Sequence, residues 1–209
     1  GFEKLVYGGL TKVFAGIVIA PIGGIIFGLL VTTLIITIFA SRKPGPVNKT
    51  FGRLQIISSA WFALTHGAND GQKTMGIIVL ILFSAGLIPD LEMPLWVIFA
   101  AATAMGLGTF FGGYKVIKTL GVKITKLKPY QGFAAETSGG LMLAVFAVFG
   151  IPASTTHAIT GTIMGSGAAR RKRAVRWKVS RQIVFSWIIT IPGAAGLGIG
   201  FTYLINLFV

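Results

Sequence analysis

A polar segment interrupts an otherwise apolar stretch of the chain at residues 65–76. It reads Thr-His-Gly-Ala-Asn-Asp-Gly-Gln-Lys-Thr-Met-Gly and lies between apolar runs at 56–64 and 77–87. Asparagine and aspartate favour turns and helix caps over helix interiors, and glycine weakens a helix. The pattern therefore predicts a broken helix, whose free N–H and C=O groups can bind anions and cations. Its candidate ligands are His66, Asn69, Asp70, Gln72, Lys73 and Thr74.

A second segment, Gly-Ile-Pro-Ala-Ser-Thr-Thr-His at 150–157, has the composition of a helix start. Pro152 ends one helix, and the next helix is predicted to continue through 158–167. The hydroxyl residues Ser154, Thr155 and Thr156 are placed to cap it. Hydroxyls and free amides together form an anion site that needs no arginine. The alternative is ordinary capping of a kinked helix.

A third group, Glu136-Thr137-Ser138, precedes two glycines at 139–140. Carboxylate and hydroxyl oxygens are ligands that suit a hard cation. The alternative is a structural glutamate paired with a base. His66 and His157 are candidate ligands or proton carriers, although a histidine in apolar surroundings is often a hydrogen-bonded packing residue.

The elements that must position these groups are unusually apolar. The chain has 209 residues, of which 54% are hydrophobic and 11% are charged, against about 25% charged residues in soluble domains. Its long apolar runs predict membrane-spanning helices, because lipid forces backbone groups to pair within the segment. The alternation typical of a β-barrel is missing. The absence of cysteine excludes disulfides and thiolate sites.

The net charge of +14 is explained by topology rather than by nucleic-acid binding, since the basic residues cluster between apolar runs. The basic loops 41–53, 114–128 and 170–181 are predicted to be cytoplasmic, and the acidic 89–94 loop to lie opposite. Residues 129–169 must then form a helical hairpin, as two passes or as a re-entrant element. We predict one all-α, polytopic transmembrane domain over 1–209, with spans at 5–40, 54–88 (broken), 94–113 and 182–209 besides the hairpin.

Ionisable residues inside membrane spans are costly and point to function. His66, Asp70, Lys73, Glu136 and His157 all fall in or beside the polar segments. A simpler interpretation is that Asp70 and Lys73 pair with each other, or that Lys73 extends to an interface.

The segment Gly-Ala-Asn-Asp at 67–70, followed by Gln-Lys-Thr-Met-Gly at 72–76, resembles the signature of the inorganic phosphate transporter (PiT) family, bacterial type. Pro-Ala-Ser-Thr-Thr-His at 152–157 and the acidic Glu136 resemble that family's other motifs. The resemblance implies a secondary transporter, not an enzyme, that carries phosphate with sodium or protons. It also implies two inverted repeats, of which this chain is similar to the second. A missing N-terminal half would supply the partner set.

The resemblance further implies a multi-pass protein of the cell (inner or plasma) membrane, with phosphate and sodium ions as ligands and no cofactor. A homodimer is expected. Phosphate would bind to Asn69, Asp70, Ser154, Thr155 and Thr156. The cation would bind to Asp70, Glu136, Thr137, Ser138 and His66, with Gln72, Lys73, Thr74 and His157 as further candidates.

Several alternatives stay open. Within transport, the protein could be a proton-coupled phosphate or metal–phosphate symporter instead of a sodium symporter. An ion channel with broken helices as its filter and a structural membrane subunit are readings from other classes. An intramembrane hydrolase would lack a recognisable nucleophile elbow or zinc motif.

Overall fold

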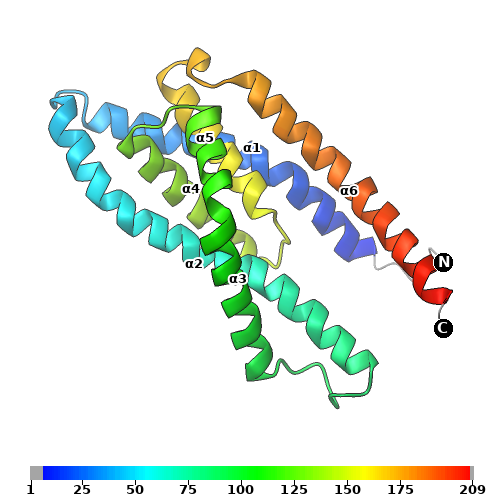
Figure 1. Ribbon diagram of the computed structural model, residues 1–209. Helices are drawn as coiled ribbons and strands as arrows, with labels where there is room; N and C mark the ends of the chain where they lie inside the picture. Colours follow the sequence, from blue (N-terminus) through cyan, green and yellow to red (C-terminus); the bar gives the residue numbers. More distant parts are fainter. Residues whose placement is uncertain (1–6, 208–209) are drawn as a thin grey trace. The chain divides into compact units, whose positions relative to one another are not determined.

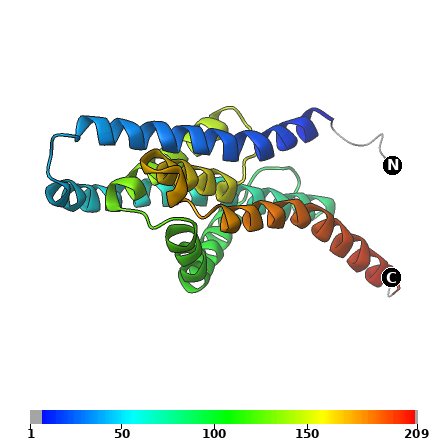
Figure 2. The same ribbon diagram turned by 90° about the horizontal axis from the view of Figure 1, so that it is seen from above.

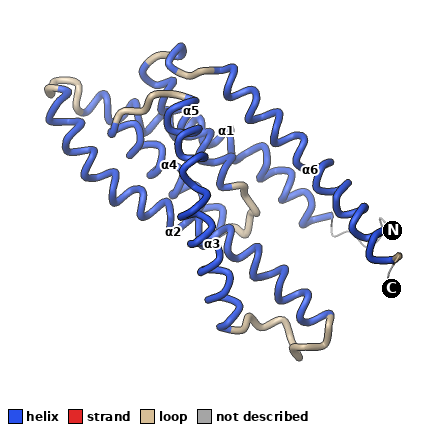
Figure 3. The backbone as a smooth tube through the Cα atoms, viewed as in Figure 1, coloured by secondary structure: helices blue, strands red, loops and turns tan. Residues whose placement is uncertain are grey.

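The computed structural model describes residues 7–207, which form six α-helices and contain no strand (Figures 1 and 3). The predicted all-α fold class is therefore confirmed. A π-helical turn at Thr119–Ile124 continues α3, and a 3-10 turn at Lys172–Ala174 follows α5. The α-helices are α1 (Tyr7–Ile38), α2 (Pro44–Ser84), α3 (Leu95–Lys118), α4 (Pro129–Val148), α5 (Thr155–Arg170) and α6 (Trp177–Asn206).

The chain divides into two compact units, Gly1–Val175 and Arg176–Val209, where the sequence was interpreted as one domain. The first unit contains α1 to α5 and all the candidate ligands. The second unit contains α6, an apolar 30-residue helix with Pro192 in its interior.

Within residues 7–207, three helical segments are long and apolar enough to cross a membrane: α1, α3 with its π-helical extension (Leu95–Ile124), and α6. Large apolar side chains remain exposed along them, and Phe110 and Phe111 on α3 are 80% and 79% exposed. Such a surface suits lipid rather than water. The membrane class predicted from composition agrees with this surface.

Helix α5 lies alongside α1, and this is the most extensive packing in the first unit (Figures 1 and 2). Small residues recur every four positions on the buried stripe of α1, at Gly16, Ala20, Gly24 and Gly28. A Cβ atom added at Gly28 would collide with the backbone of Thr162 on α5. Small residues in such a row let two membrane helices approach backbone to backbone. The stripe on α1 therefore fixes the position of α5.

Helix α2 is continuous from Pro44 to Ser84, so the break predicted within residues 54–88 is wrong (Figure 3). A break in an apolar environment would leave backbone groups unpaired, which costs more than glycine's weak helix propensity. Gly67 and Gly76 have open space where a Cβ would lie, so no close contact requires glycine there. The helix runs through both positions without interruption. The helix also begins ten residues before the predicted span, because Pro44 and Pro46 fit the first turn.

Helices α4 and α5 occupy the range predicted to form a hairpin. The end of α4 is a Schellman motif, in which the Ile151 N–H donates to the Phe146 carbonyl (2.9 Å) and Gly150 N–H to Ala147 (3.1 Å). Gly150 has φ +59°, a conformation that glycine adopts without strain. The turn redirects the chain into the start of α5 at residue 155.

Candidate functional site

Three ionisable side chains share one face of α2 near its middle. The carboxylate of Asp70 accepts a hydrogen bond from Lys73 Nζ at Oδ1 (3.0 Å), and its Oδ2 lies 3.1 Å from His66 Nε2. These residues are three and four positions apart, which places them together on a helix surface. Asp70 and Lys73 therefore do pair, as the simpler interpretation of this segment had it.

The start of α5 meets this face of α2. Thr155 Oγ1 donates to Asp70 Oδ2 (2.8 Å), and Lys73 Nζ donates to the Ala153 carbonyl (2.7 Å) in the connection before α5. The two segments singled out in the sequence, 85 positions apart at Asp70 and Thr155, thus form one cluster. We call His66, Asp70, Lys73 and Thr155 the Asp70 cluster.

The N-terminus of α5 has the geometry of an anion site. Ser154 Oγ accepts from the His157 N–H (3.4 Å), and Ala158 donates the first intrahelical bond to the Ser154 carbonyl (3.0 Å). The amides of Thr155 and Thr156 precede that bond and belong to the open end of the helix. The positive end of the helix dipole therefore faces the Asp70 cluster.

A cavity of ≈ 740 Å³ lies beside this helix end, between α2, α3, α4 and α5. Thr155 and Thr156 reach it from α5, His66 from α2 and Glu136 from α4. Its volume falls within the range of small-molecule sites, and most of its remaining lining is apolar. It therefore has room for an anion and ions that accompany it.

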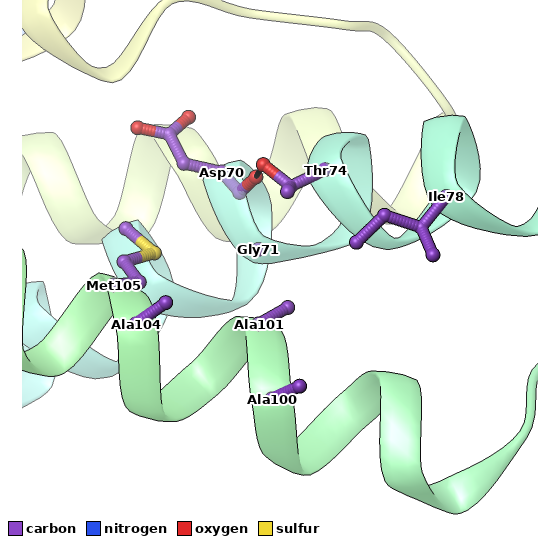
Figure 4. Close-up of a pocket in the computed structure, with 8 residues that line it drawn as sticks. All are labelled: Asp70, Gly71, Thr74, Ile78, Ala100, Ala101, Ala104 and Met105. Carbon is purple, nitrogen blue, oxygen red and sulfur yellow. Dashed lines mark hydrogen bonds between the residues drawn. The ribbon is translucent and has the colours of Figure 1, made fainter.

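A second cavity of ≈ 510 Å³ lies between α2 and α3. It is lined by Asp70, Gly71, Thr74 and Ile78 and by a mainly alanine face of α3 (Figure 4). The Asp70 side chain extends away from that face (Figure 4), and Thr74 Oγ1 bonds back to the Asp70 carbonyl (3.5 Å). The polar side of Asp70 therefore faces the start of α5 rather than α3.

Glu136 belongs to a different cluster. Its Oε2 accepts from Ser58 Oγ (2.5 Å) and its Oε1 from Gln55 Nε2 (3.4 Å), both on α2. Gln55 and Ser58 are not among the residues predicted from the sequence, although two polar residues three positions apart at the start of an apolar run were the available signal. Asp70 follows Ser58 by about 18 Å along the helix. Among residues 7–207, His, Asp and Glu side chains form no group of three suited to a metal ion.

Other candidates lie away from these clusters. Ser138 is buried and donates to the Ala134 carbonyl of its own helix (2.6 Å), with the Phe27 carbonyl of α1 at 3.4 Å. Successive helix residues point about 100° apart, so the side chains of Glu136, Thr137 and Ser138 point in different directions. Asn69 is buried on α2 and belongs to the lining of neither cavity, and Gln72 is exposed.

His157 is a packing residue in this structure. Its ring hydrogen-bonds the backbone of Ile17 on α1. Pro21, inside α1, lacks the N–H that would pair with the Ile17 carbonyl. The histidine therefore satisfies a group that the proline leaves without a helical donor, and it fixes α5 against α1.

The chain is similar in sequence and in fold to known proteins. Residues 1–198 match the phosphate transporter family. A "probable low-affinity inorganic phosphate transporter" of Rhizobium meliloti is 46% identical over 93% of this chain and 59% of its own length. A Bacillus subtilis protein with the same description is 38% identical over 99% of the chain and 62% of its length. A solved structure titled "The sodium-dependent phosphate transporter" has a TM-score of 0.71 at 24% identity, covering 88% of this chain and 63% of that one.

The fold and the site define an all-α membrane protein in which an open helix N-terminus lies against an acidic side chain. The chain belongs to the phosphate transporter family, which confirms the resemblance stated from its motifs. Members of this family are transporters rather than enzymes. The chain spans about three fifths of the length of the curated relatives, 59% and 62% for the two named above.

Proposed function

We propose that the protein to which this chain belongs imports inorganic phosphate across the cell membrane by cation symport. The observation that carries the proposal is the contact between the α5 N-terminus and Asp70 in the middle of α2, through Thr155 (2.8 Å). This contact lies at a cavity that Thr155 and Thr156 line. The family membership supports phosphate as the substrate.

Phosphate would bind at the start of α5. The amides of Thr155 and Thr156 and the hydroxyls of Ser154, Thr155 and Thr156 are donors aimed at the same end of the helix, which favours an anion. Asp70 accepts hydrogen bonds at both oxygens, from Lys73 and from Thr155. Because the Thr155 hydroxyl donates to Asp70, it has to turn away from Asp70 to donate to phosphate. Asp70 can then accept the O–H of protonated phosphate, a bond that sulfate cannot offer.

A cation would bind at Glu136. The carboxylate of Glu136 and the hydroxyl of Ser58 are oxygen ligands of the type that hard cations prefer. Gln55 now donates its amide N–H to Glu136, so its side chain would have to rotate to offer its oxygen to the cation. Sodium is the cation we favour, and the name of the solved neighbour describes that protein as sodium-dependent. Both sites open on one cavity, so positive charge at one favours negative charge at the other, reciprocally.

Proton coupling is the second candidate, and the His66–Asp70 contact favours it. His66 Nε2 lies 3.1 Å from the Asp70 carboxylate, and histidine is the side chain that most readily carries a proton near neutral pH. In this version, His66 would load a proton before phosphate binds.

The hairpin would be re-entrant. Its tip contacts Lys73 through Ala153, and Lys73 precedes the end of α2 at Ser84 by about 16 Å of helix. Helix α5, with 16 residues, is about 24 Å long, shorter than the roughly 30 Å hydrocarbon core. Re-entrant backbone is tolerated where protein or a water-filled cavity satisfies it. The inverted repeat that the resemblance implies would close the site from the other side. We also propose that the protein forms a homodimer.

The test is uptake of radiolabelled phosphate into proteoliposomes that contain the full-length protein, at fixed pH, with or without an inward sodium gradient. Saturable accumulation driven by sodium supports the proposal, and accumulation driven only by a proton gradient supports the second candidate. Phosphate flux that follows its own gradient and never accumulates would indicate a channel. No phosphate flux from folded protein under either gradient would refute phosphate transport.

A further inference from the structure

Lys73 holds a position that the transport scheme above leaves unexplained. Its ammonium lies between a carboxylate oxygen, Asp70 Oδ1 at 3.0 Å, and a backbone carbonyl oxygen, Ala153 at 2.7 Å. Carboxylate and carbonyl oxygens from two different segments are the ligand types that hold a hard cation such as sodium. The Lys73 ammonium therefore lies between two oxygens that would otherwise suit a bound cation.

The position of Lys73 changes the charge balance of the Asp70 cluster. Asp70 is negative and contacts the Thr155 hydroxyl at the start of α5, where phosphate, also negative, would bind in the proposed scheme. Without a positive charge beside them the two anions repel each other in a partly desolvated site. The Lys73 ammonium cancels the charge of Asp70 through a direct contact, while its side chain remains 44% exposed.

The Lys73 ammonium also connects α2 to the segment before α5. Lys73 belongs to α2, whereas Ala153 belongs to the connection that immediately precedes Ser154 and Thr155. An ion bridging the same oxygens would draw the tip of the hairpin onto α2 in the same way. Lys73 performs both tasks, neutralisation and bridging, without an ion from solution.

We propose that Lys73 is a tethered counter-cation that takes the place of one diffusible coupling cation beside Asp70. The inference rests on the proposed function and specifies its coupling. Phosphate transport by this protein then requires one cation fewer than it would with an uncharged residue at this position, and Glu136 remains the site of a diffusible ion.

The test compares the sodium dependence of phosphate uptake for the wild-type full-length protein and Lys73→Met, which keeps the length of the side chain without its charge. We expect the variant to transport at least tenfold more slowly than wild type at low sodium. Raising sodium should restore the rate, with a Hill coefficient for sodium about one unit higher. Lys73→Arg should behave like wild type. Lys49→Met, at an exposed position on the same helix, is the matched control and should leave the curve unchanged.

A second measurement needs no transport. The sodium-induced rise in melting temperature of detergent-solubilised protein should be larger for Lys73→Met than for wild type, because the variant has gained a sodium site. If Lys73→Met does not fold, Lys73→Gln replaces it in both measurements.

The inference is overturned if the variant keeps the wild-type sodium curve, or if uptake stays lost at every sodium concentration while Lys73→Arg transports. Either result leaves the proposed function standing, because wild-type uptake is measured alongside. An absence of wild-type phosphate uptake would instead refute the proposed function.

Discussion

Thr155 contributes the one side chain of α5 that bonds directly to Asp70. Its hydroxyl, at 2.8 Å from Oδ2, can turn between the carboxylate and a bound anion. The residue before it, Ser154, is already engaged as the helix cap, and Thr156 is exposed at the cavity. The three consecutive hydroxyls are therefore placed differently: that of Ser154 caps the helix, that of Thr155 donates to Asp70, and Thr156 lines the cavity in which we propose that phosphate binds.

Replacing Thr155 with valine should weaken phosphate binding. A hydrogen bond to a charged group contributes about 1.5–3 kcal/mol, so the apparent KM for phosphate uptake should rise about tenfold or more. Thr155→Ser keeps the hydroxyl and should stay near wild type. Thr190→Val, whose hydroxyl bonds back to Trp187 of its own helix (2.7 Å), is the control. Equal phosphate KM values for Thr155→Val and wild type would contradict the assigned role.

Removing the hydroxyl of Ser58 should change the cation dependence of transport. Ser58→Ala deletes the shortest hydrogen bond to Glu136 (2.5 Å), and we expect the apparent sodium affinity to fall about three- to tenfold, in line with a loss of about 1 kcal/mol. Glu136→Gln should have a larger effect in the same direction. Ser84→Ala is the matched control, since its hydroxyl bonds the carbonyl three residues back (2.9 Å), as that of Ser58 also does (3.1 Å). An unchanged sodium curve for both site variants would exclude a cation at Glu136.

Candidate residues such as His66, Asp70 and Thr155 could be identified from the sequence, because several polar residues occur together within apolar runs. The residues that they contact could not be identified in this way. Gln55 and Ser58 are ordinary residues in a helix until Glu136 is placed beside them. The role of His157 depends on Pro21, which is 136 positions away in the sequence. Tertiary contacts of this kind leave no local pattern.

At the scale of elements, α1 and α5 are held together by backbone contact rather than by large side chains. The helices approach so closely at Gly28 that the Thr162 backbone occupies the space of a Cβ atom. This contact positions the α5 N-terminus, and therefore the site, against α2.

Gly28→Ala should lower stability, because the new methyl group has to separate the two helices, which costs about 1–3 kcal/mol. Gly76→Ala makes the same chemical change in open space on α2 and should be neutral or stabilising by up to about 1 kcal/mol. Melting temperatures of the two variants in detergent provide the comparison. A Gly28→Ala variant as stable as Gly76→Ala would show that the close packing is not needed.

The helical elements themselves were predictable from apolar runs, but the continuity of α2 was not. Glycines and turn-forming residues at 65–76 suggested a break, yet the backbone stays paired and the polar side chains find partners across the helix surface. In lipid, the cost of unpaired backbone groups outweighs local propensity. The sequence predicted open helix ends in two places, and the structure has one of them, at the start of α5.

At the scale of the whole molecule, the candidate binding site lies where α5 contacts α2. A cavity between α2, α3, α4 and α5 adjoins it. Its relatives are longer by about two fifths of their length. Under the proposed function, the inverted repeat that the resemblance implies would complete the phosphate site.

The central claim is that phosphate binds in the cavity beside the α5 N-terminus, and site-directed thiol labelling tests it most directly. This chain has no cysteine, and any others in the full-length protein are first replaced. Ala63→Cys places one thiol in the cavity lining, one helical turn before His66, and Ala85→Cys places the control at the exposed end of the same helix. We predict that phosphate, compared with chloride at equal ionic strength, slows maleimide labelling at position 63 several-fold and leaves position 85 unaffected. Labelling at position 63 that ignores saturating phosphate, in a variant that still transports phosphate, would contradict the claim.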